Sequence, residues 1–99
     1  MGAASSASVS ARTTGPPCTQ RALNVGVHRG ATPFGATSGV YSPWGCSGRF
    51  AYGNFDVDGN EITVLFIASG RGWKTASRGR YCTNHSVPRR IYHNACEVN

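Results

Sequence analysis

Four cysteines constrain this chain more than any other feature of its sequence. The chain has 99 residues, holds 13 glycines and carries an even set of cysteines, at Cys18, Cys46, Cys82 and Cys96. Lysine and glutamate together supply only three residues. This composition is typical of small exported proteins that disulfides hold together in an oxidising compartment. We therefore expect two disulfides and a secreted or extracytoplasmic location.

The pairing of the cysteines stays open at the level of sequence, because four cysteines allow three connectivities. We favour Cys18–Cys46 with Cys82–Cys96, since each bond joins neighbouring segments and neither crosses the other. In the chain-entropy model, loops of this length contribute roughly 3–4 kcal/mol each to the free energy of unfolding. That is comparable with the whole stability of so small a core.

The N-terminal segment has a different composition from the rest of the chain. Residues 1–17 are rich in alanine and serine and carry a single basic side chain, that of Arg12. Such a segment buries too little apolar surface to offset its ordering entropy. We expect residues 1–17 to form a disordered tail and residues 18–99 to form one disulfide-stapled domain. The sequence contains no apolar run long enough to span a membrane and no signal peptide, so export requires that a leader has been removed.

Apolar periodicity predicts an α+β fold, with a helix before an antiparallel sheet of three or four strands and a short helix after it. The first helix is expected at residues 18–29. Strands are expected at residues 39–44, 50–56, 62–68 and 73–77, with Tyr81-Cys82 as an extension of the last one. The C-terminal helix is expected to start with Pro88 and to turn Val87, Ile91 and Ala95 to one face.

Two of these strands have predictable places in the sheet. The segment at residues 62–68 is apolar on both faces, with Ile62, Val64 and Phe66 on one and Leu65 and Ile67 on the other. A strand of this kind belongs at the centre of a sheet. Pro43 indicates that the segment at residues 39–44 is an edge strand. Asp58-Gly59 predicts a tight hairpin between the second and third strands.

Several stretches match, when taken together, a pattern known from other proteins. They are Gly45-Cys46-Ser47-Gly48-Arg49-Phe50-Ala51-Tyr52-Gly53, the stretch Gly70 to Trp73, Arg80-Tyr81-Cys82, and Val87-Pro88 with Ile91 and Ala95-Cys96. In these stretches the chain resembles small secreted proteins and lipoproteins of actinobacteria, most of which have no assigned function. The resemblance covers residues 18–99 and implies export, two disulfides and one domain. Phe50 departs from the pattern, which commonly has tryptophan there, and no catalytic residue is carried over.

Charge gives the clearest hint of function. The net charge is +6, nine of the ten basic residues are arginine, and three of the four acidic residues lie close together, at Asp56, Asp58 and Glu61. The planar fork of arginine suits phosphate and carboxylate groups. The candidate anion-binding residues are Arg71, Lys74, Arg78, Arg80, Arg89 and Arg90, and the candidate aromatic contacts are Trp44, Trp73, Tyr81 and Tyr92. Such a surface could attract nucleic acid, a teichoic-acid-like wall polymer or anionic lipid, although a solvated basic surface without a partner is the plainer reading.

Two constellations suggest other chemistry. Cys82, His85, His93 and Cys96 have the spacing C-x2-H-x7-H-x2-C, and neutral histidine with thiolate is a normal zinc set. The alternative is that the two cysteines are bonded to each other. Glu61, a histidine at position 85 or 93, and Arg80 supply the residue types of a small secreted ribonuclease, although their spacing does not show that they converge.

The sequence as a whole favours an exported, non-enzymatic binding module that recognises a protein or a cell-envelope component, as an inhibitor or an accessory factor. We expect a monomer without catalytic residues, cofactor, metal site or transmembrane segment. A cationic polyanion-binding or antimicrobial protein and a small ribonuclease-like enzyme are the alternatives.

Overall fold

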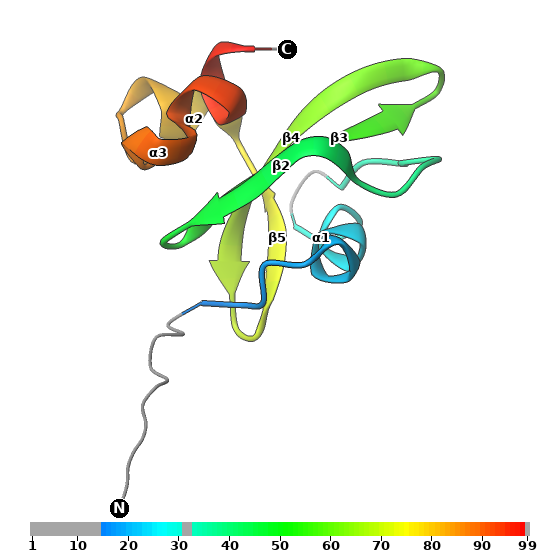
Figure 1. Ribbon diagram of the computed structural model, residues 1–99, viewed down its shortest axis with the longest axis horizontal. Helices are drawn as coiled ribbons and strands as arrows, with labels where there is room; N and C mark the ends of the chain where they lie inside the picture. The colour runs from blue at the N-terminus through cyan, green and yellow to red at the C-terminus, as the bar shows by residue number, and fades with distance from the viewer. Residues whose placement is uncertain (1–14, 31–32, 99) are drawn as a thin grey trace, which may run out of the picture.

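The computed structural model describes residues 15–30 and 33–98, and most of the predicted tail, residues 1–14, lies outside them. Within the described ranges, an antiparallel four-stranded sheet has the order β2-β3-β4-β5, so each strand pairs with its neighbour in the sequence (Figure 1). The strands are β2 (Tyr41–Ser47), β3 (Phe50–Val57), β4 (Asn60–Ser69) and β5 (Gly72–Ala76). The helices are α1 (Gln20–Gly26), α2 (Arg78–Thr83) and α3 (Arg89–Tyr92), and α3 continues into the π-helical turn η2 (His93–Glu97). The predicted α+β fold is confirmed.

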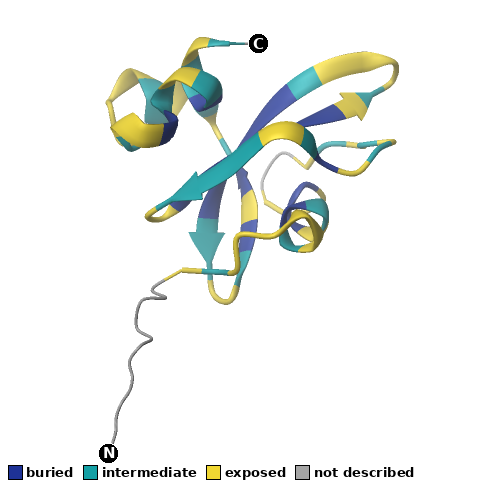
Figure 2. Ribbon diagram, in the orientation of Figure 1, coloured by how far each residue is buried: buried dark blue, intermediate teal, exposed yellow. Residues whose placement is uncertain are grey.

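Helices cover both faces of the sheet. Figure 1 shows α1 and the pair α2 and α3 on opposite sides of the strands, and Figure 2 shows that burial is concentrated in the middle of the sheet. β4 lies between two other strands and is buried on both faces, as its apolar pattern predicts. β2 is an edge strand that contains Pro43, also as predicted. The result is three layers, with a separate apolar cluster on each face of the sheet.

The cluster beneath α1 contains the largest buried side chains. Phe55 and Phe66 are fully buried and meet edge to face, with 6.0 Å between their ring centroids. Leu23 of α1 and Trp73 of β5 complete this side, and Trp73 has only 1% of its surface exposed. Trp73 and Phe66 are therefore core residues. Burial of the aromatic ring is the main stabilising contribution that such a side chain makes.

The second cluster joins the sheet to the C-terminal helices. It contains Phe50, Tyr52, Leu65 and Ile67 from the strands together with Val87, Ile91 and Ala95 from the C-terminal segment. The three C-terminal residues share one buried face, which confirms the predicted pattern. Pro88 differs by one position, because it immediately precedes α3 as its N-cap residue instead of being its first helical residue.

The hairpin and both disulfides follow the sequence-based expectations. Asp58 and Gly59 have φ angles of 51° and 83° between β3 and β4, the left-handed values that a tight hairpin turn requires. The disulfides are Cys18–Cys46 and Cys82–Cys96, with Cα atoms 6.0 Å and 5.7 Å apart. The favoured pairing is therefore confirmed.

Three elements differ from the prediction. The first strand was expected at residues 39–44, but β2 is shifted toward the C-terminus and runs over Tyr41–Ser47. Tyr81 and Cys82 lie in helix α2 and do not extend the sheet, because the Ser77 hydroxyl accepts a hydrogen bond from the Arg80 amide and caps a new helix directly after β5. Helix α1 ends at Gly26, earlier than the predicted residue 29. The carbonyl of Arg29 instead accepts two hydrogen bonds from Thr75, which tie the chain to the edge of β5.

No helix among the described residues is long and apolar enough to cross a membrane.

Gly26 sets the distance between α1 and the sheet, and this predicts the effect of a substitution. A Cβ atom at Gly26 would lie 2.9 Å from Cβ and 3.0 Å from the carbonyl oxygen of Trp73. Gly26→Ala is therefore expected to push α1 away and lower the free energy of unfolding by about 2 kcal/mol, as overpacking does. Gly35→Ala is the control, because nothing lies within 4 Å of a Cβ atom there. Urea denaturation of both variants tests this, and equal stabilities would contradict it.

Candidate anion-binding surface

The connection between α2 and α3 is held in one conformation by its own hydrogen bonds. The Ser86 amide donates to the Asn84 side chain and to the Tyr81 carbonyl, and the His85 amide donates to the Cys82 carbonyl. His85 has a φ of 59°, a left-handed value that is uncommon outside glycine. Asn84, His85 and Ser86 are exposed in this connection, whereas Val87 packs into the second apolar cluster.

Side chains of the segment from His85 to Arg89 alternate between two shallow pockets. Ser86 and Pro88 line a pocket of about 500 Å³, which we call the Tyr81 pocket. His85, Val87 and Arg89 line a pocket of about 300 Å³, which we call the Tyr92 pocket. The segment is therefore a ridge between two pockets, and one elongated ligand could contact both of them.

The Tyr81 pocket combines an apolar floor with cations. Phe50 and Ile67 form the floor, and the Tyr81 ring meets Phe50 edge to face, with 5.4 Å between centroids. Arg49 lines the pocket, and the Arg80 guanidinium lies 5.3 Å from the centroid of the Tyr81 ring. Both side chains are exposed at the surface, so their forks are available to a ligand.

Lys74 adds a further charge beside this floor. It is the cross-strand partner of Ile67, so the two side chains stand on the same face of the sheet. Lys74 itself is exposed.

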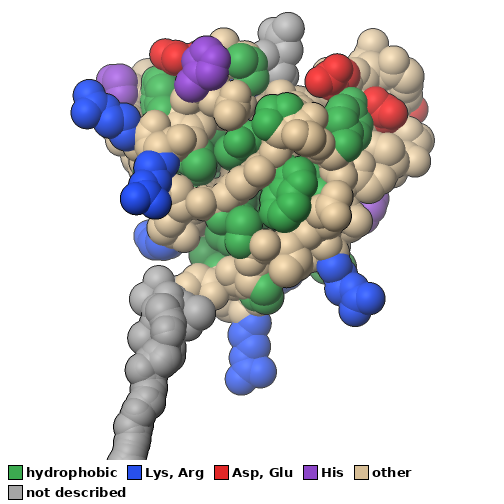
Figure 3. Space-filling model, in the orientation of Figure 1, with side chains coloured by type: hydrophobic (Ala, Val, Ile, Leu, Met, Phe, Trp, Pro, Cys, Tyr) green, Lys and Arg blue, Asp and Glu red, His purple; other side chains and the backbone are tan. Residues whose placement is uncertain are grey.

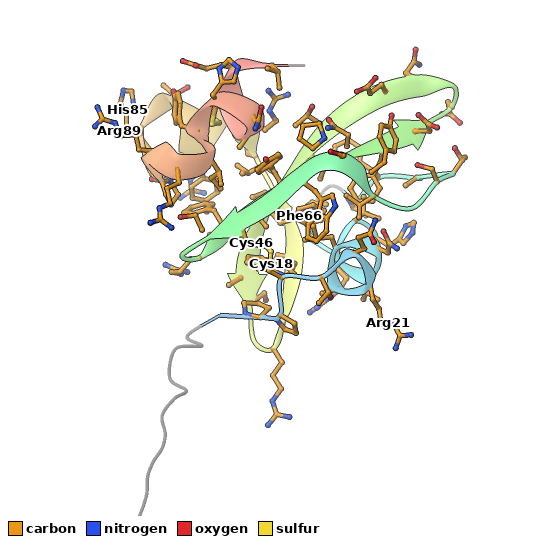
Figure 4. All side chains as sticks on the ribbon, in the orientation of Figure 1. Cys18, Arg21, Cys46, Phe66, His85 and Arg89 are labelled. Atoms are coloured by element: carbon orange, nitrogen blue, oxygen red, sulfur yellow. A yellow bond between two sulfur atoms is a disulfide. The ribbon has the colours of Figure 1, made fainter. Side chains whose placement is uncertain are left out.

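The Tyr92 pocket has a similar combination of a ring stack and a cation. The rings of His85 and Tyr92 stack, with centroids 5.9 Å apart and planes inclined by 25°. The Tyr92 hydroxyl donates to the Cys82 carbonyl at 3.0 Å, which fixes the stack. Figure 4 shows His85 and Arg89 next to each other at the outer end of the C-terminal helices. We call the two pockets and the ridge the Arg–Tyr surface, which consists of Arg49, Phe50, Ile67, Lys74, Arg80, Tyr81, His85, Ser86, Val87, Pro88, Arg89 and Tyr92.

Negative charge is kept away from this surface. The chain has four acidic residues, and none of them is among the described residues that line the two pockets. Asp56, Asp58 and Glu61 lie at the β3–β4 hairpin, and Glu97 is 3.1 Å from His93. Figure 3 shows acidic side chains at the upper right, away from the basic ones, and one more at the upper left, where it lies against a histidine.

Tyr41 interacts with one of these acidic residues. Its hydroxyl donates a hydrogen bond to the Asp56 carboxylate, and burial together with this bond raises the pKa of Tyr41 to about 12.

The structure brings together some of the predicted anion-binding residues and separates others. Lys74, Arg80 and Arg89 lie on the Arg–Tyr surface with the predicted aromatic residues Tyr81 and Tyr92. Lys74 and Arg80 line neither pocket themselves but lie next to the pocket residues Ile67 and Tyr81. Arg90 is exposed on α3, lines neither pocket and has no such contact with a pocket residue among the described ones. Arg71 lies at the β4–β5 turn and lines a different pocket.

Three predicted contact residues have internal positions instead. Trp73 is buried beneath α1, and Trp44 is half-buried against the same cluster. The Arg78 guanidinium donates to the carbonyls of Ala95, Cys96 and Val98. Partial burial also lowers the pKa of Arg78. These three side chains hold the fold, and Arg78 has few donors left for a ligand.

The sequence reasoning missed Arg49. It lies at the tip of the β2–β3 hairpin, immediately after Gly48, whose φ of 60° makes the turn. The signal that could have found it is its place in the short turn between two predicted strands, because binding residues are disproportionately common in exposed loops.

The zinc and ribonuclease hypotheses find no support in the geometry. Cys82 and Cys96 are bonded to each other, so their sulfurs are not available as thiolate ligands. His93 pairs with Glu97, whereas His85 stacks on Tyr92 in a different place. Glu61 lines a separate pocket with Thr63 and Asn94. The carboxylate and His85 therefore line different pockets and do not form a common site.

Comparison with known proteins does not assign the chain. No protein-family model matches it, and neither curated proteins nor solved structures give a significant match.

Proposed function

We propose that this protein is an exported, non-enzymatic binding module that holds an anionic component of the cell envelope on the Arg–Tyr surface. The observation that carries the proposal is the pair of pockets lined by Arg49 and Arg89 together with aromatic rings. The Arg80 guanidinium against the Tyr81 ring and Lys74 opposite Ile67 add charge beside the first of them. The sequence left a protein partner open beside the envelope component, with polyanion binding as an alternative function, and experiment distinguishes these outcomes. As part of the same proposal, the protein is one of the small secreted proteins of actinobacteria that its sequence resembles.

The chemistry of the surface suits a phosphate-bearing chain. Each arginine offers a planar fork of donors that matches a phosphate, and the rings and the floor of Phe50 and Ile67 give apolar contact between the charges. The ridge is held by its own hydrogen bonds, so little ordering of the backbone is needed on binding. A repeating anionic polymer could place successive charges on both sides of the ridge.

The architecture is compatible with export. Two disulfides are stable in an oxidising compartment and uncommon in the cytosol.

Salt dependence of polymer binding tests this function. We expect poly(glycerol phosphate) to bind, and neutral dextran of similar length not to bind. If about four ion contacts form, the affinity should fall about 50-fold between 50 mM and 200 mM NaCl, by analogy with flexible single-stranded polyanions. Isothermal titration calorimetry at several salt concentrations measures this. Binding that is insensitive to salt would contradict a site made of exposed arginines.

A matched pair of triple variants locates the site. The first variant changes Arg49, Arg80 and Arg89 to glutamine. It is expected to bind the polymer at least tenfold more weakly, because each exposed ion contact contributes up to about 1 kcal/mol. The control changes Arg21, Arg29 and Arg71 to glutamine, which removes the same charge from the other side of the sheet. The control is expected to lose little affinity. Equal losses in both variants would show that net charge alone attracts the polymer and would overturn the proposed site.

A further inference from the structure

A further pocket lies on the opposite side of the sheet from the Arg–Tyr surface and has a different character. It has a volume of about 270 Å³ and a mostly apolar lining. The lining residues come from the segment before α1, from α1 and its C-terminal turn, and from the β4–β5 hairpin; they are Pro17, Thr19, Arg21, Ala22, Val25, Arg29, Arg71, Gly72 and Trp73. We call it the Val25 pocket, because Val25 is 56% exposed and is the only large apolar residue so exposed among residues 15–30 and 33–98.

Three arginines from different elements surround this apolar lining. Arg21 belongs to α1, Arg29 follows it, and Arg71 forms the turn between β4 and β5. Figure 4 shows Arg21 pointing outward from α1, far from the labelled pair His85 and Arg89. None of the four acidic residues of the chain lines the pocket, and the one ion pair found in the described part of the chain is that of His93 with Glu97. The rim therefore carries positive charge that the protein itself does not neutralise.

The walls of the pocket are fixed before any ligand arrives. The Trp73 indole Nε1–H donates to the Pro17 carbonyl at 3.0 Å, and the Cys18–Cys46 disulfide holds the adjoining residue to β2. The Arg29 carbonyl accepts hydrogen bonds from both the amide and the hydroxyl of Thr75. A preformed apolar pocket with a cationic rim costs little conformational entropy to fill.

The apolar lining and the cationic rim together indicate which kind of ligand the pocket can bind. The apolar lining favours one aliphatic or aromatic group, and the rim favours negative charges on several sides of that group. Three cations line this one pocket, so a single carboxylate would neutralise only part of their charge. A peptide segment with acidic residues on both sides of an apolar side chain complements all of it.

We propose that the Val25 pocket docks an acidic segment of a partner protein and takes up one apolar side chain of that segment. Val25 and Ala22 contact the apolar side chain, while Arg21, Arg29 and Arg71 pair with the carboxylates. The site is independent of the Arg–Tyr surface, and the protein thereby contacts two different partners on opposite sides of its sheet.

A short synthetic peptide tests the proposal. The probe is acetyl-Glu-Asp-Leu-Asp-Glu-amide, titrated into the full disulfide-bonded protein and followed by ¹H–¹⁵N NMR. The expected result is saturable shifts of the Trp73 indole N–H and of the Arg21 and Val25 amides. Replacing leucine by serine in the peptide should weaken binding at least tenfold. Replacing its four acidic residues by their amides should have an effect of similar size, and a peptide that binds equally well without leucine would overturn the pocket.

Substitutions in the protein complete the test. Val25→Asp is expected to weaken peptide binding at least tenfold, and Arg21→Gln and Arg71→Gln about threefold each. Val25 is exposed, so this change should not disturb folding, and Val25→Ala provides a milder variant. The control is the Arg49, Arg80 and Arg89 triple variant, which should bind the peptide as the wild type does. Unchanged binding by Val25→Asp would overturn the proposal.

A small apolar carboxylate is the competing occupant. If octanoate binds with the same dependence on Arg21 and Val25 while the peptide does not bind, the pocket takes a small molecule and the docking proposal is wrong. Either outcome is separate from polymer binding on the Arg–Tyr surface, which uses other residues and another probe.

Discussion

Replacing Cys18 and Cys46 by alanine is expected to lower the free energy of unfolding by about 3.6 kcal/mol, the largest effect expected from the loss of one disulfide or one side chain. The bond closes a loop over a sequence separation of 28 residues, and the estimate follows from the chain entropy that such a crosslink removes from the unfolded state. The corresponding change at Cys82 and Cys96, with a separation of 14, is expected to cost about 3.0 kcal/mol. Urea denaturation followed by tryptophan fluorescence measures both, since Trp73 is buried in the native state.

The sum of these losses leads to a stronger expectation. A domain of this size typically has little more than 5 kcal/mol of stability, so the variant without either disulfide should be largely unfolded at 37 °C. The wild-type protein in excess reductant is the control and should behave in the same way. A loss below 1 kcal/mol for the Cys18 and Cys46 pair would contradict the chain-entropy account. It would also show that the helix layer is held by packing alone.

The sheet was predictable because its signals are local. The two-faced apolar pattern of residues 62–68 requires cover on both sides, and β4 has that cover from α1 on one face and the C-terminal helices on the other. The Asp58-Gly59 turn has little choice of conformation, since the hairpin needs two left-handed residues. The disulfide pairing also followed from a simple rule, because neighbouring segments lie close together in a meander of short connections.

The limits of the helices depended on tertiary contacts that periodicity does not report. The capping role of Ser77 separates Tyr81 and Cys82 from β5, although aromatic and apolar residues there are compatible with a strand. The early end of α1 reflects the bonds between Arg29 and Thr75, residues 46 positions apart. Arg21 and Val25 are four residues apart, so they are neighbours on the surface of a helix. This spacing was visible in the sequence and could have indicated the cationic and apolar sides of the Val25 pocket.

The candidate anion-binding residues were the least predictable part. Each of these residues carries one positive charge, so the sequence does not distinguish them, but packing places them in different environments. Arg80 lies over a tyrosine ring at the surface, Arg71 belongs to another pocket, and Arg78 is turned inward. The segment from Ile62 to Ala95 contains no acidic residue. An arginine there can therefore bind a ligand or donate to the free carbonyls of a helix end, and only the fold distinguishes the two roles.

Arg78 is accordingly expected to act on stability and not on ligand binding. Its Nε–H donates to the Ala95 carbonyl at 2.9 Å, and Nη2 donates to the carbonyls of Cys96 and Val98. Arg78→Met keeps the apolar stem and removes every donor, so the last carbonyls of η2 lose their partners. Hydrogen bonds to a charged group contribute about 1.5–3 kcal/mol each, but these hydrogen bonds are only partly buried, so water replaces part of the loss. We expect a decrease of about 3 kcal/mol in the free energy of unfolding.

The design of the Arg78 experiment separates geometry from charge. Arg90→Met removes the same charge from an exposed position on α3 and should change the stability by less than 0.5 kcal/mol. Arg78→Lys keeps the charge but offers a single ammonium group in place of a planar fork, so it should restore less than half of the loss. Hydrogen exchange should then increase first in η2, because the guanidinium holds that turn to α2. Full rescue by lysine would mean that charge at the helix end, and not the three-way contact, stabilises the C-terminal segment.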